Sequence, residues 1–135
     1  MPSDYNVALQ AKVTKTATFN GAAVKLPGGT PRRGLVARVV YSAASEAGTD
    51  ADTVTFSVDV CYDGVPTTWN SDFVAPPITL PQLSAGATSG EILIPFSISP
   101  TSVANATQVR LTATFSSAAH TDTITYQGDI VFERP

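Results

Sequence analysis

Hydrophobic and polar residues alternate along most of this chain, and that alternation constrains its fold more than any other feature. In the stretch TVTFSVDVCY at 53–62, valine, phenylalanine and tyrosine take every second position. Successive side chains of a β-strand point to opposite faces, so the pattern predicts one face toward a core and one toward water. No segment has a convincing 3.6-residue period, and we therefore predict an all-β protein.

The same rhythm predicts about eight strands with turn signals between them. Their candidate ranges are 5–19, 22–26, 35–42, 53–62, 65–69, 78–83, 91–99, 108–116 and 121–132. Many short strands of this kind predict a single antiparallel β-sandwich domain spanning residues 1–135. Jelly-roll and immunoglobulin-like topologies both fit the pattern.

Glycine and proline mark the expected turns and irregularities. Asn20-Gly21 and Asp63-Gly64 each predict a tight hairpin, because glycine adopts the positive φ that such turns need. Pro95 lacks the N–H of a sheet ladder and predicts an edge strand or a bulge. Gly128 predicts a bulge in the last strand. The first strand is unusually long, which predicts a bend or a strand break near Ala11–Val13.

Charged residues make up only 14% of the chain, against about 25% in typical proteins. A weakly charged surface rich in hydroxyl groups is easily buried against a partner, although β-proteins also favour threonine in general. Residues 1–40 carry six Lys or Arg and one Asp, whereas residues 41–135 carry two Arg and ten acids. The split is consistent with cross-strand ion pairs or with docking on an acidic neighbour. The overall acidic balance argues against nucleic-acid binding.

The sequence offers no set of catalytic residues, and we predict a protein that is not an enzyme and holds no cofactor. His120 is the single histidine and no G-x-S-x-G elbow is present, so His120 is read as a solvated loop residue. Cys61 is the single cysteine and is read as a packed small residue. Asp50 and Asp52 could supply oxygen ligands for calcium, but the EF-hand spacing is absent. We read them as a solvated acidic turn and predict no metal site.

The N-terminal residues contain no apolar segment of signal-peptide type, and no apolar run reaches transmembrane length. These features predict synthesis in the cytoplasm without a signal peptide and no association with a membrane.

Trp69 is the single tryptophan and lies in a polar stretch after Asp63-Gly64. Three interpretations remain open for it. It could anchor a protein contact, cover the open end of the core, or form a sugar-stacking platform with Tyr62.

The segments TVTFSVDVCYDGVPTTW (53–69) and QVRLTATFSSAAHTDTITYQGDIVFE (108–133) resemble a pattern of small virion proteins of tailed bacteriophages. In those proteins a strand ending in Asp-Gly precedes a loop, and a late strand pair closes the sheet. The resemblance spans about residues 53–132 and implies a capsid cement or decoration protein. Such proteins are β-sandwiches or jelly rolls that sit as oligomers on the capsid exterior and clamp neighbouring major capsid subunits.

The resemblance leads us to expect a structural virion protein that acts as a homo-oligomer, a dimer in preference to a trimer, with the phage major capsid protein as its partner. The expected contact residues are Tyr5 in the N-terminal arm, Arg32 and Arg33 in the proline-flanked loop, and Trp69. The alternative function is a carbohydrate- or host-surface-binding module of a phage tail or adhesin.

Overall fold

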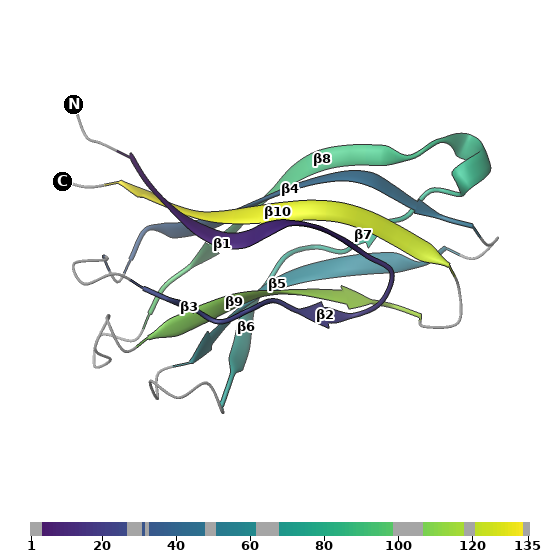
Figure 1. Ribbon diagram of the computed structural model, residues 1–135. Coiled ribbons are helices and arrows are strands. Elements are labelled where there is room, and N and C mark those ends of the chain that lie inside the picture. Colours follow the sequence, from purple (N-terminus) through teal and green to yellow (C-terminus); the bar gives the residue numbers. More distant parts are fainter. Residues whose placement is uncertain are drawn as a thin grey trace.

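The computed structural model describes residues 4–26, 31, 33–47, 51–61, 68–98, 107–117 and 121–133, which form two packed antiparallel sheets (Figure 1). Sheet A contains, in spatial order, β1 (Asp4–Lys15), β10 (Asp122–Glu133), β4 (Leu35–Glu46) and β8 (Thr88–Phe96). Sheet B contains, in spatial order, β2 (Phe19–Asn20), β9 (Gln108–Phe115), β5 (Thr53–Cys61) and β6 (Asn70–Val74). Two further short strands, β3 (Val24–Lys25) and β7 (Ile78–Thr79), pair with β9 and β5. A 3₁₀ turn, η1, spans Leu83–Ala85.

The strand pairing within the described residues is that of a jelly roll. Strands β2 and β3 follow one another along β9, and β6 and β7 follow one another along β5, so ten segments fill eight strand positions. The pairs β1–β10, β2/β3–β9, β4–β8 and β5–β6/β7 are those of a long hairpin rolled into two sheets. The predicted β-sandwich of about eight strands is therefore confirmed, and the pairing selects the jelly roll over the immunoglobulin-like alternative.

Two strand positions of sheet B are each divided into two short strands, β6 and β7 in one case and β2 and β3 in the other. Pro76 and Pro77 lie between β6 and β7, where the missing N–H groups end the ladder. The hairpin predicted at Asn20-Gly21 is wrong, because β2 and β3 both pair with β9 instead of with each other. A Cβ on Gly21 would lie 2.5 Å from Gln10 Oε1 and 2.8 Å from the Leu111 carbonyl oxygen. This glycine is needed for close approach and not for a turn.

The pairing of β1 with β10 is irregular, and it tests the predictions made for Ala11–Val13 and for Gly128. The register of β1 against β10 shifts between Ala8 and Gln10 and again between Gln10 and Val13, which confirms the bend predicted near Ala11–Val13. Register shifts lie on both sides of Gly128 in the β1–β10 ladder, where a bulge was predicted, but the extra residues belong to β1, and β10 runs evenly past Gly128 along β4. A Cβ on Gly128 would lie 3.0 Å from Leu111 Cδ2 of the opposite sheet. Pro95 lies in β8, an edge strand of sheet A, as predicted.

The core lies between the sheets and is formed by the inward positions that alternation predicts. Phe56 of β5 and Tyr126 of β10 meet edge to face across it, with ring centroids 5.0 Å apart. The most deeply buried apolar side chains include Leu26, Leu35, Val39, Val54, Phe56, Val58, Val60, Leu111, Ile124, Tyr126 and Ile130. Among the described residues, no helix is long and apolar enough to cross a membrane.

Tyr126 is expected to make the stability of the fold fall in alkaline solution. Burial raises the pKa of Tyr126 from 10.0 to about 12, because the phenolate loses its hydration. Between these two pH values the unfolded chain releases this proton and the folded chain keeps it, so the free energy of unfolding falls as pH rises. The Tyr126 hydroxyl has no hydrogen-bond partner, so Tyr126→Phe should cost little at neutral pH.

Urea unfolding at several pH values measures this effect. Tyr126→Phe should flatten the loss of stability between pH 10 and 12 relative to the unmodified chain. An equally steep loss in the variant would show that other groups cause it.

Candidate functional site

The outer face of sheet B carries a stacked pair, Trp69 over Arg110. The Arg110 guanidinium carbon lies 4.3 Å from the centre of the Trp69 ring. Arg110 Nε also donates a 2.9 Å hydrogen bond to Asp59 Oδ2, and the two residues face each other directly in the β5–β9 ladder. Asp59 is 2% exposed although it occupies an outward position. The tryptophan therefore helps to cover a buried ion pair.

Thr112 extends this arrangement, because its hydroxyl lies 2.6 Å from Asp59 Oδ2 and 3.2 Å from Asn20 Oδ1. The outward face of β5 was expected to be wet, yet Ser57 and Cys61 are buried as well. At Asp59 this face is covered by Arg110 of β9 and by Trp69, which stacks on Arg110. One face of the Trp69 ring is already occupied by a cation, which leaves the other face for any contact with a partner.

The expected contact residues lie toward one end of the sandwich. Tyr5 pairs with Phe132 in the β1–β10 ladder, and exposed Arg33 comes just before β4. Trp69 comes just before β6, whose first residue pairs with Val60 near the end of β5. Both chain termini lie at this same end (Figure 1). Arg32 and Tyr62 lie outside the described residues, and so does His120.

The outer face of sheet A carries a stripe of apolar side chains that hydrophobic alternation did not predict as a contact surface. The residues of this stripe point outward from three neighbouring sets of paired positions across β10, β4 and β8. Leu93 is 56% exposed and Val40 is 36% exposed. We call this surface the apolar stripe; it consists of Val36, Val40, Leu93, Pro95 and Val131.

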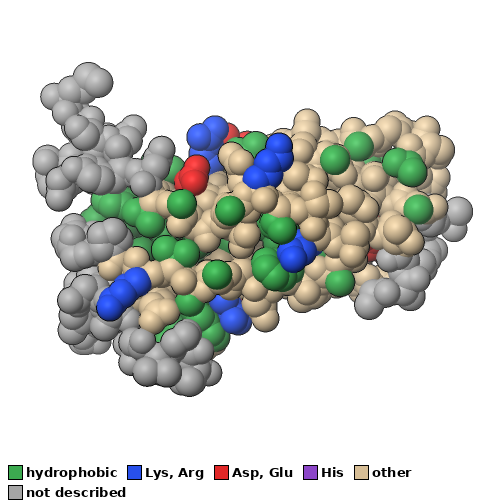
Figure 2. All heavy atoms as spheres, viewed as in Figure 1, with side chains coloured by type: hydrophobic (Ala, Val, Ile, Leu, Met, Phe, Trp, Pro, Cys, Tyr) green, Lys and Arg blue, Asp and Glu red, His purple; other side chains and the backbone are tan. Residues whose placement is uncertain are grey.

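Charged residues share these three sets of paired positions with the apolar stripe, because Arg38 pairs with both Asp129 and Leu93, and Glu91 pairs with Val40. Arg38 and Glu91 form an ion pair with a 2.8 Å N–O distance across β4 and β8, and both side chains are about half exposed. Over the view in Figure 2 charged side chains are few and scattered, and uncharged polar side chains and backbone cover much of the surface. This surface therefore combines exposed apolar side chains with a half-exposed ion pair.

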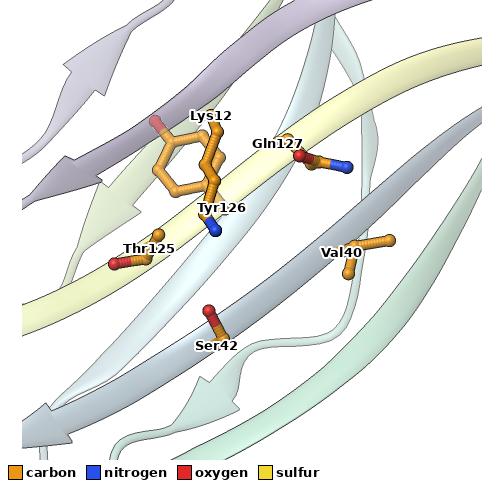
Figure 3. Close-up of a pocket in the computed structure, with 6 residues that line it drawn as sticks. All are labelled: Lys12, Val40, Ser42, Thr125, Tyr126 and Gln127. Carbon is orange, nitrogen blue, oxygen red and sulfur yellow. The ribbon is translucent and has the colours of Figure 1, made fainter.

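A shallow hollow of about 170 Å³ adjoins the apolar stripe at Val40. Figure 3 shows the residues that line it on β1, β10 and β4, with Lys12 reaching over the strands toward Thr125 and Ser42. Ligand pockets usually measure about 300–1,000 Å³. The hollow is too small and too open to enclose a substrate, but it can receive one side chain of a protein partner.

Three carboxylates form the arrangement in the described residues that could hold a metal ion. The side chains of Glu46, Asp52 and Asp122 bring one oxygen each within 4.8 Å of the others, and all three residues are buried. Asp52 was read as part of a solvated turn, but it is 5% exposed. Cys61 is buried as expected for a packed residue. The expectation that the protein is not an enzyme stays a prediction.

No protein-family model matches the chain, and no curated protein sequence matches it.

Proposed function

We propose that this protein is a structural virion protein that binds the outside of a bacteriophage capsid and stabilises it by clamping neighbouring major capsid subunits. The observation that carries the proposal is the apolar stripe on the outer face of sheet A. Leu93 and Val40 are large apolar side chains held on a regular sheet, at 56% and 36% exposure. Exposed apolar surface of this kind is typical of protein contact sites.

The remaining features favour a contact protein over a small-molecule site. The hollow beside Val40 is small, and Arg38 and Glu91 form an ion pair whose partial exposure lets it adjust at an interface. Jelly rolls are common in viral capsid proteins and in lectins. Fold alone does not decide between them, and the sequence resemblance to decoration proteins favours the capsid.

The clamp would act as a homo-oligomer, because symmetry repeats one modest contact over a lattice and the repeats add in binding strength. A dimer is our first expectation and a trimer our second. The end that carries Tyr5 and Arg33 adjoins the apolar stripe at Val36, since Val36 pairs with Pro95 and Val131 in the rows nearest that end. Basic Arg33 and the apolar stripe would then face the same capsid surface.

Binding to capsids tests the proposal directly. We expect intact particles to contain the chain in a fixed, lattice-like copy number, and particles stripped of it to rebind the purified protein. Val40→Asp combined with Leu93→Asp should lower rebinding at least about tenfold, because two charges would enter an apolar contact. Co-sedimentation at equal protein concentration measures the bound fraction.

Ser71→Asp is the matched control, since Ser71 is exposed on β6 of the other sheet. This variant should rebind like the unmodified chain. Particles that lack the protein would refute the proposed function. Full rebinding by the double variant, with loss of rebinding in Trp69→Ala, would move the contact to sheet B.

A further inference from the structure

Three buried carboxylates meet at the end of the sandwich away from the chain termini. Glu46 is the last residue of β4, Asp52 comes just before β5, and Asp122 is the first residue of β10. Their exposures are 1%, 5% and 0%, and one oxygen of each lies within 4.8 Å of the others. Residues of both sheets therefore contribute to one small cluster, which we call the carboxylate cluster.

A β-bulge at Ala43 directs Glu46 into this cluster. The ladders of β4 with β10 and with β8 both skip a residue here, and Ala43 has a φ of 52°. Because of the extra residue, the inward positions of β4 change from odd to even numbers, so Glu46 faces inward in place of Ser45. Bulges commonly re-aim a side chain beside a functional site.

The backbone holds all three segments in place. Glu46 N donates to the Pro81 carbonyl, Ala47 N to the Thr121 carbonyl and Leu80 N to the Asp52 carbonyl, each at 2.9 Å. Ligands fixed before binding lose little freedom when an ion arrives. These bonds fix the backbone from which the three carboxylates extend.

The environment of Glu46 points to a missing positive charge. Glu46 and Asp122 face each other directly in the β4–β10 ladder, where like charges destabilise a sheet. Glu46 Oε2 accepts a 3.0 Å hydrogen bond from Asp52 N. Its other oxygen, Oε1, is buried without a hydrogen-bond partner. Within the described part of the chain, the ion pairs join other residues, and no lysine or arginine pairs with Glu46.

We propose that Glu46, Asp52 and Asp122 bind one calcium ion that ties the two sheets together. A cation between the three carboxylates would neutralise most of their charge and give Glu46 Oε1 a partner. Three carboxylates offer up to six oxygens, which is the lower limit of the about 6–8 that Ca²⁺ takes. The site is distinct from the apolar stripe, so it can exist whether or not the protein binds capsids.

The donor set decides which ion fits. Zinc favours nitrogen and sulfur ligands, and the cluster contains oxygen alone. Magnesium usually keeps several water molecules of its own, which suits this buried position poorly. Calcium accepts bidentate carboxylates in irregular geometry and is the hard cation that the cluster fits best.

Calorimetric titration of the full chain, freed of metal with a chelator and then desalted, tests the proposal. We expect saturable binding of one Ca²⁺ per chain and a Tm that rises with calcium concentration, because only the folded state assembles the site. Glu46→Gln keeps the shape and removes one charged ligand. Changes outside the ligand shell already cost about 10- to 100-fold in affinity, so this variant should lose at least about tenfold.

Asp72→Asn is the matched control, because Asp72 is exposed on β6 and its loss should leave calcium affinity unchanged. If Glu46→Gln does not fold, Asp52→Asn takes its place. The binding of one Ca²⁺ per unmodified chain tests the proposal without any variant. An absence of saturable binding would overturn the proposal. Binding that Glu46→Gln leaves intact would overturn it as well, and saturation by Mg²⁺ but not Ca²⁺ would overturn the choice of ion.

Discussion

Arg110→Met is expected to lower the free energy of unfolding by about 3 kcal/mol, because it leaves the Asp59 carboxylate buried without its counter-ion. Asp59 is 2% exposed on its side chain and Arg110 is 20% exposed, so solvent screens this pair weakly. Methionine keeps an unbranched apolar stem like that of arginine and lacks the guanidinium group. The loss therefore reports on the charge and on the Trp69 stack, and not on a cavity.

Arg38→Met supplies the comparison, since Arg38 pairs with Glu91 on the other sheet at nearly the same N–O distance, 2.8 Å against 2.9 Å. The side chains of Arg38 and Glu91 are 48% and 46% exposed. Exposed ion pairs contribute about 0–1 kcal/mol to the free energy of unfolding. Urea unfolding of both variants measures the difference. Equal losses would show that the burial of Asp59 does not govern the strength of the pair.

Much of the fold could be predicted because period-two alternation is a local property of the sequence. The inward positions of β5 and β10 follow it without interruption, so the alternation alone assigns Phe56 and Tyr126 to a core, and both are buried there. The hairpin prediction failed at Gly21 because a glycine is required both in tight turns and where other atoms approach the backbone closely. The sequence alone does not distinguish these two reasons. The neighbours that need that space, Gln10 and Leu111, lie far away in the sequence.

The carboxylate cluster could not be predicted because alternation assumes a constant phase. The bulge at Ala43 changes that phase, and composition made the residues after Ser42 look like a loop, whereas β4 continues to Glu46. Asp122 is about seventy-five residues further along the chain and pairs with Glu46 only in the folded sheet. An acid within a run of small residues, next to an acidic turn, was the signal that the sequence did contain.

The apolar stripe was missed for a different reason. Val36 and Val40 place apolar residues on the second face of β4, as is usual for a strand with neighbours on both sides, and β4 does lie between β10 and β8 in sheet A. Whether that second face is covered or exposed depends on the layers of the fold, and no local pattern contains that information. The exposure of Leu93 likewise follows from the place of β8 at the sheet edge.

Phe56→Ala is expected to cost about 3–5 kcal/mol of unfolding free energy, the usual loss when a large buried aromatic side chain is truncated. Phe56 is fully buried on β5 of sheet B, and its ring meets Tyr126 of sheet A at a 68° interplanar angle. Truncation removes this contact and leaves a cavity between the sheets. Neighbouring β-branched side chains on regular strands have few rotamers with which to fill it.

Phe73→Ala is the matched control, because Phe73 also packs edge to face against an aromatic ring, that of Phe96 at 6.0 Å, but is only partly buried on β6 at a sheet edge. Since water can enter where Phe73 stood, its loss should be clearly smaller than that of Phe56. Urea unfolding compares the two variants. Both ring pairs join the two sheets, Phe73–Phe96 at the edge strands and Phe56–Tyr126 at the central strands. A loss at Phe73 equal to that at Phe56 would show that the edge contact stabilises the sandwich as much as the central one.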